Sequence, residues 1–174
     1  MIRLRLFRFF KSDCDKVQHI RMGRTLESTI FEIASLFIII VTWVVAVLMY
    51  RHAPETIPTH FDLNGNPNNE GSRMVILFIA GISTILTLGM TACAYVPTYV
   101  VNPPTKLKTP RQYILASRMV RIIALVTGLL FISTILMMGY PESPWPRYLL
   151  IAAIGMIIVV TIIFTILIAR ARKA

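Results

Sequence analysis

The residues best suited to chemistry gather in one polar stretch, IPTHFDLNGNPNNEGSR at residues 57–73. His60, Asp62 and Ser72 are the residue types of a base, an orienting carboxylate and a nucleophile. Their spacing forms no recognisable catalytic arrangement. We therefore expect no catalytic residue in this stretch and a protein that is not an enzyme.

The same stretch begins like a calcium loop, in which alternate oxygen ligands converge on one hard cation. Asp62, Asn64 and Asn66 have that spacing, but Pro67 stands in place of the glycine and Arg73 in place of the bidentate glutamate. A zinc set is the second metal alternative, and its candidate ligands have no diagnostic spacing: His52, His60, Asp62 and Glu70. We expect neither a bound metal nor another cofactor.

Proline and glycine positions predict that the stretch is a compact turn. Pro54 and Pro58 fix their own backbone torsions and favour an extended approach to His60. Asn64-Gly65 is a strong tight-turn pair, because both residues tolerate positive φ. The sequence thus predicts a hairpin-like cap with three apolar residues turned toward the helix ends: Ile57, Phe61 and Leu63.

Two alternatives stay open for the polar side chains of this cap. In one, the His60 ring is hydrogen-bonded to loop backbone or to Asp62, and the acidic and amide side chains hold turns through bonds to backbone. In the other, His60, Asp62 and Asn64 contact a ligand outside the cell.

The elements that position this stretch are expected to lie in a membrane. The chain has 174 residues, of which 56% are hydrophobic and 15% charged, and its mean hydropathy is +0.69. A helix needs about 20 mostly apolar residues to cross the hydrocarbon core, because no water is there to satisfy backbone polar groups. Four segments without a charged residue meet this requirement: 33–50, 74–96, 122–140 and 148–169. We predict an all-α integral membrane protein in which residues 1–174 form one four-helix domain, with a compact extracytoplasmic loop at residues 51–73.

The net charge is +10, and the distribution of Lys and Arg along the chain indicates membrane topology and not a nucleic-acid site. Every Lys and Arg lies before the first segment, between the second and third, or after the fourth, except Arg51, Arg73 and Arg147. Because cytoplasmic segments carry the excess of Lys and Arg, both termini are expected in the cytoplasm and residues 51–73 outside. The basic cytoplasmic face is expected to contact anionic lipids.

Two basic regions are predicted on the cytoplasmic side, one before the first segment and one between the second and the third. Residues 1–29 are expected to be retained, since no small-x-small cleavage site follows the first apolar run. Residues 2–11 fit either an amphipathic helix in the headgroup layer or a disordered basic tail. Residues 96–112 contain four prolines and predict an extended linker.

Small and hydroxyl residues recur at helical spacing in three segments, which favours close helix packing in lipid, within one chain or in a homo-oligomer. These residues are Ala80, Thr84, Thr87, Thr91 and Ala94, then Ala124 and Gly128, and then Thr161, Thr165 and Ala169. No ionisable residue lies near the middle of a segment, which argues against a transport path. Glu32 and Arg121, at cytoplasmic edges of the first and third segments, either form an inner-leaflet ion pair or reach the headgroups separately.

The fixed positions of the loop resemble the signature of a bacterial membrane domain of unknown function that is found in the SdpI-like immunity proteins. Family members read P-x-x-I-P-x-H-[FW]-[ND]-x-x-G-x-P-[DN]-x-x-G-[ST]-K between a first and a second membrane helix. The resemblance covers residues 54–73, with Arg73 where lysine is usual and Asn68-Asn69-Glu70 in place of a common Asp-Gly-aromatic stretch. SdpI-like proteins carry further membrane spans after this domain, whereas four are predicted here.

The resemblance implies a protein of the bacterial cytoplasmic membrane whose outward loop recognises a peptide, protein or lipid partner. SdpI-like proteins protect a producing cell from a secreted toxic peptide, so toxin immunity or signal reception is the sharpest form of this expectation. The expected recognition residues are Pro54, Ile57, Pro58, His60, Phe61, Asp62, Asn64, Gly65, Pro67, Gly71, Ser72 and Arg73. The alternative is an accessory subunit of a membrane transporter, which the small-residue stripes and the basic cytoplasmic face favour.

Overall fold

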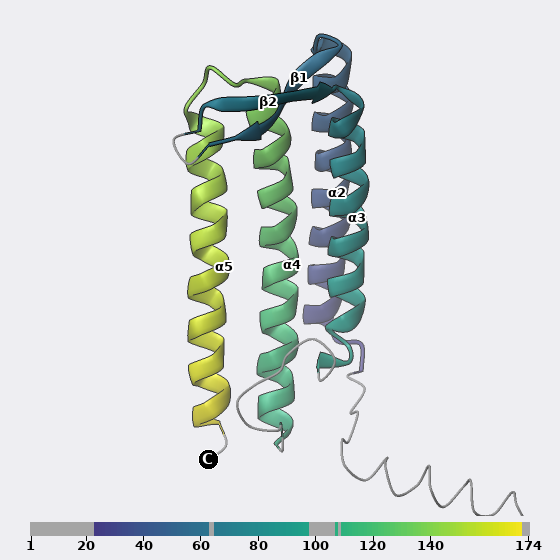
Figure 1. Cartoon of the computed structure of the whole chain (residues 1–174). Coiled ribbons are helices and arrows are strands. Elements are labelled where there is room, and N and C mark those ends of the chain that lie inside the picture. The colour runs from purple at the N-terminus through teal and green to yellow at the C-terminus, as the bar shows by residue number, and fades with distance from the viewer. Residues whose placement is uncertain (1–22, 63–64, 98–106, 108, 172–174) are drawn as a thin grey trace, which may run out of the picture.

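Four long helices lie side by side, and a β-hairpin crosses one end of them (Figure 1). This computed structural model describes residues 23–62, 65–97, 107 and 109–171. The elements are α2 (Leu26–His52), β1 (Thr56–Phe61), β2 (Pro67–Ser72), α3 (Met74–Cys93), α4 (Pro110–Gly139) and α5 (Trp145–Arg170). All four helices are long and apolar enough to span a membrane, which confirms the predicted multi-pass architecture with a compact loop between the first two spans.

The helix ends differ from the predicted segments, because counting apolar residues stops at the first charge whereas a helix continues to its cap. α4 begins at Pro110 and not at Ile122, so the extended linker predicted for residues 96–112 is wrong at residues 110–112. Thr109 and Gln112 form the capping box of this helix, in which each side chain accepts a hydrogen bond from the backbone N–H of the other. The C-terminal end of α3 also differs from the prediction, because this helix ends at Cys93 and not at residue 96.

The start of α2 shows the same effect. The helix begins at Leu26, so residues 26–29 of the predicted basic segment are helical. Thr25 is its N-cap and forms a capping box with Ser28. Residues 2–11, for which an amphipathic helix or a disordered tail was predicted, lie outside the described residues.

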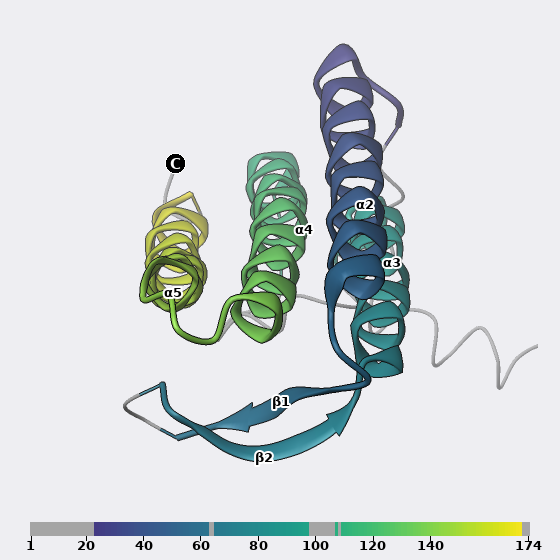
Figure 2. The same cartoon turned by 90° about the horizontal axis from the view of Figure 1, so that it is seen from above.

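α4 is the central helix of the bundle. It packs against α2, α3 and α5, while α2 and α3 also pack against each other. Seen from the hairpin end, α2, α3 and α4 form a group and α5 lies beyond α4 (Figure 2). Most of the apolar surface of α5 is therefore exposed on the outside of the bundle.

The bundle interior contains two apolar clusters with small polar residues between them. The cluster near the hairpin is Ala46, Ile57, Ile76, Ala80, Ile135 and Met138, and the cluster near the opposite end is Ala94, Ala116, Met119, Val120 and Ile168. Thr42, Ser83 and Thr87 are buried as well, and Thr42 donates its hydroxyl to the Ile38 carbonyl. The small-residue stripes of α3 and α4 thus pack inside this chain, whereas Thr161 of the α5 stripe is exposed.

Candidate recognition surface at the hairpin end

The hairpin is fixed to the bundle by two apolar residues, Ile57 and Phe61. Antiparallel pairing places Thr56 opposite Ser72 and Ile57 opposite Gly71. Because strand side chains alternate between faces, Ile57 turns toward the helices while Thr56 and Ser72 turn to solvent. Ile57 is 2% exposed, and Phe61 packs against the same cluster. Both therefore anchor the hairpin, as the sequence predicted for apolar residues of the cap.

Arg73 joins the base of the hairpin to α2. Its backbone N–H donates to the Glu55 carbonyl at 3.0 Å, and its Nη1 donates to the Ala53 carbonyl at 3.2 Å. The guanidinium carbon lies 5.0 Å from the centre of the Tyr50 ring, within the range of a cation–π interaction. This loop residue is thus occupied by contacts within the chain.

The turn is built by Asp62 and Gly65. Asp62 Oδ1 accepts the Asn66 backbone N–H at 2.7 Å, and the Gly65 N–H donates to the Asp62 carbonyl at 3.0 Å. Gly65 has φ +84°, a conformation that side chains other than glycine rarely adopt. A Cβ at Gly65 would lie 2.6 Å from Cδ of Arg147, at the start of α5, so the turn also contacts that helix. Leu63 and Asn64 lie outside the described residues.

His60 has a different partner from the one predicted. Its Nδ1 lies 2.8 Å from Oδ1 of Asn68 across the hairpin, whereas the sequence suggested loop backbone or Asp62. The register pairs His60 with Asn69 near the turn and places Ser72 at the base of the hairpin. His60 and Ser72 are thus at opposite ends of the sheet. Among the described residues, no three His, Cys, Asp or Glu side chains are grouped closely enough to hold a metal.

An open groove of about 500 Å³ lies at the base of the hairpin. It is lined by Tyr50, Glu55, Thr56, Glu70, Gly71, Ser72, Arg73 and Met74. Glu55 and Glu70 are exposed, and in the described part of the chain neither carboxylate has an ion-pair or hydrogen-bond partner. Sequence reasoning did not single out Glu55.

A second, more enclosed groove of about 260 Å³ lies between the end of α2 and the turn before α5. Its lining is mostly apolar and includes Met49, Pro54, Pro58, Met138 and Tyr140. Pro54 and Pro58, predicted as recognition residues, therefore border this groove and not the acidic one.

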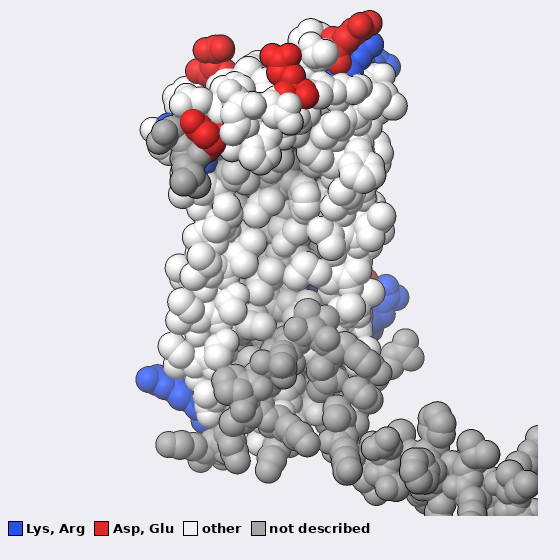
Figure 3. Space-filling view, in the orientation of Figure 1, with Lys and Arg blue, Asp and Glu red and all other residues white. Residues whose placement is uncertain are grey.

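Acidic side chains mark the surface of the hairpin end (Figure 3). They belong to Glu55, Asp62, Glu70 and Glu142. In the described residues the cations at this end are Arg51, Arg73 and Arg147, and the two other acidic residues, Glu27 and Glu32, lie at the opposite end of the bundle. The hairpin end is thus slightly acidic in a chain whose net charge is +10.

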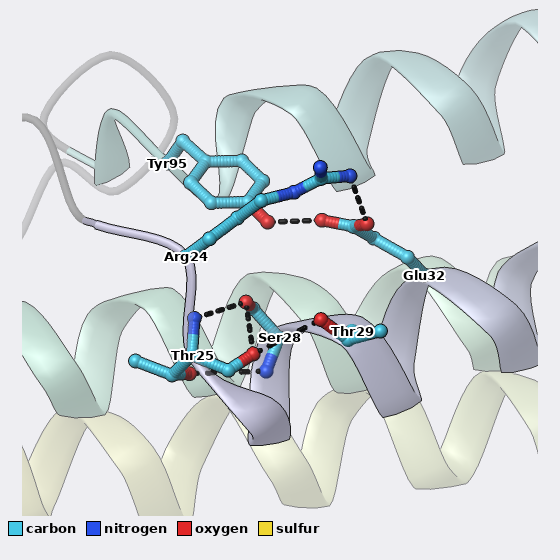
Figure 4. A network of polar contacts seen from close by, with 6 residues as sticks. All are labelled: Arg24, Thr25, Ser28, Thr29, Glu32 and Tyr95. Carbon is cyan, nitrogen blue, oxygen red and sulfur yellow. Dashed lines mark hydrogen bonds and ion pairs between the residues drawn. The ribbon is translucent and has the colours of Figure 1, made fainter.

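Glu32 belongs to a polar network at the opposite end (Figure 4). Its carboxylate accepts a hydrogen bond from Arg24 at 2.8 Å and another from the Tyr95 hydroxyl. Arg121 is 6% exposed, and its guanidinium carbon lies 5.3 Å from the centre of the Tyr95 ring. The predicted direct Glu32–Arg121 ion pair is not formed in the described part of the chain. Tyr95, which sequence reasoning did not single out, contacts both side chains.

A second ion pair at this end was also missed. Arg118 of α4 donates from Nε and Nη2 to the two carboxylate oxygens of Glu27, both at 2.6 Å, and so links α4 to the start of α2. The hydrogen bond to Glu32 raises the pKa of the Arg24 guanidinium above its ordinary value, so Arg24 stays charged. The Arg118–Glu27 pair therefore connects α4 with α2, whereas the Arg24–Glu32 pair ties the segment before α2 to that helix.

Comparisons with other proteins give a family match for the hairpin and its flanking helices. Residues 37–84, which cover much of α2, both strands and the first half of α3, match the family described as Domain of unknown function (DUF1648). An uncharacterized protein of Archaeoglobus fulgidus is 37% identical over 51 residues, which is 29% of this chain and 28% of that protein. No solved structure matches. The chain is therefore similar to this domain in the segment that forms the hairpin.

Proposed function

We propose that the chain is a non-enzymatic protein of the bacterial cytoplasmic membrane that recognises a polypeptide partner with its hairpin end, which faces outward. The main observation that supports this proposal is the acidic groove at the base of the hairpin, which Ile57 and Arg73 hold against the bundle. A fixed surface with side chains that have no internal partner is suited to binding, because little ordering entropy is lost when a ligand docks. Toxin-peptide immunity is the sharpest form of this proposal.

The outward orientation of the hairpin rests on the distribution of Lys and Arg. In a variant with both native cysteines replaced by serine, Ser72→Cys is expected to react with a membrane-impermeant maleimide in intact spheroplasts, because Ser72 is exposed at the hairpin end. Arg170→Cys, exposed at the opposite end, should react only after permeabilisation. The reverse labelling pattern would overturn the orientation.

Recognition of a polypeptide predicts a specific covalent adduct at the hairpin. A photo-crosslinking amino acid at Asn69, exposed on β2, is expected to capture a defined polypeptide in the native host. The matched control is Ile151, which is 58% exposed on α5 and should capture lipid. Mass spectrometry of the adducts distinguishes the two. Lipid adducts alone at both positions would contradict the proposed function.

A further inference from the structure

β2 leaves one edge of the sheet without a neighbour. The sheet has two strands, and β1 is the strand that contacts α4. Figure 2 shows β1 nearer the helix ends and β2 on the side away from them. Among the described residues no third strand pairs with β2, so its free edge can accept an added strand, although the Glu70 backbone N–H donates to Asn69 Oδ1 at 2.9 Å and must exchange that partner first.

The solvent face of the sheet carries negative charge beside this edge. Glu70 and Ser72 of β2 are exposed and line the groove with Glu55, which precedes β1. Arg73 is the cation in the groove lining, and its guanidinium is engaged by the Tyr50 ring and the Ala53 carbonyl. Arg73 forms no ion pair with either carboxylate in the part of the chain that the structure describes. Two carboxylates thus remain for an external cation.

We propose that the groove binds an extended cationic segment of a polypeptide, which adds to the free edge of β2 and places Lys or Arg side chains against Glu55 and Glu70. This inference rests on the proposed recognition function and specifies the chemistry of the partner. Backbone hydrogen bonds to β2 supply part of the affinity, and the acidic side chains select the charge of the peptide.

The dimensions of the groove agree with this ligand. A volume of about 500 Å³ lies in the range of ligand sites that hold a few side chains. In an added strand, every second side chain lies on the solvent face that Glu70 and Ser72 share. A peptide with lysine at alternate positions therefore presents its charges to the groove and its other side chains to the face of Ile57.

The test uses the full chain in nanodiscs of zwitterionic lipid, so that a cationic probe has no anionic membrane to bind. The probe is a fluorescein-labelled peptide of alternating lysine and valine, with an alternating glutamate and valine peptide for comparison. Fluorescence anisotropy should show saturable binding of the lysine peptide alone. The paired substitution Glu55→Gln with Glu70→Gln is expected to weaken binding by about three- to tenfold, the size of two exposed ion pairs.

Glu142→Gln is the matched control, because Glu142 is an exposed acidic residue at the same end but does not line the groove. It should leave the affinity unchanged. An N-methylated lysine peptide, which cannot pair with a strand edge, should bind more weakly than its parent. Equal binding of the lysine and glutamate peptides, or equal affinity of the parent chain and the Glu55/Glu70 variant, would overturn the inference.

The two proposals fail in different ways. A defined polypeptide adduct at Asn69 together with absent lysine-peptide binding would leave the recognition function in place and remove the cationic ligand. Equal binding of the parent and N-methylated peptides would overturn strand addition to β2.

Discussion

Ile57→Ala is expected to lower the free energy of unfolding by about 2–5 kcal/mol, the range for truncating a buried aliphatic side chain to alanine. Ile57 is 2% exposed and packs in the apolar cluster with Ala46, Ile76 and Ile135. Residues from three helices thus enclose one side chain of the hairpin. Its truncation leaves a cavity where the hairpin joins the bundle, so the strands should separate from the helices before the helices separate from one another.

Hydrogen exchange and thermal unfolding in detergent measure these two steps. Amides of β1 and β2 are expected to exchange faster in the Ile57→Ala variant, with little change in the middle of α4. Thr56→Ala is the matched control, because Thr56 is the preceding residue of the same strand and is exposed. It should change stability by no more than about 0.5 kcal/mol. Unchanged exchange in the Ile57 variant would show that the hairpin is held by other contacts.

Hydropathy was sufficient to predict the four spans, because a bilayer leaves few ways to satisfy a backbone. It failed at helix ends such as Pro110, where charged residues at the membrane boundary continue the helix. The hairpin turn was predictable for a local reason. Asn64-Gly65 indicates positive φ, and Gly65 is the residue with φ +84°.

The groove and the polar network depend on contacts that sequence spacing does not contain. Glu55 and Glu70 line one groove because the strand register and the end of α2 bring their segments together. Glu32 and Arg121 lie at the same end of the bundle, as their positions in the apolar segments indicated. The contact that each makes could not be predicted, because both side chains meet Tyr95, which lies beyond the end of α3.

A different physical constraint governs the middle of the bundle, where Gly128 lets α2 and α4 approach closely. A Cβ at Gly128 would overlap Cγ2 of Ile38 on α2. Burial from water gives no driving force in lipid, so close van der Waals contact of this kind contributes directly to helix association. Gly128→Ala is therefore expected to destabilise the protein by about 1–3 kcal/mol, the usual cost of overpacking a filled interior.

A loss of stability in Gly128→Ala would be informative, because helix propensity alone favours alanine over glycine by about 1 kcal/mol and so predicts a gain. Gly155→Ala is the matched control on α5, where a Cβ would meet nothing within 4 Å. It should be neutral or stabilising in the same denaturation assay. Ile38→Ala should relieve part of the cost of Gly128→Ala, since it removes the methyl group that the new Cβ meets. If both glycine variants are equally stable, α2 and α4 accommodate the added methyl group without a loss of stability. The association of the helices then depends on the Arg118–Glu27 pair and the apolar clusters.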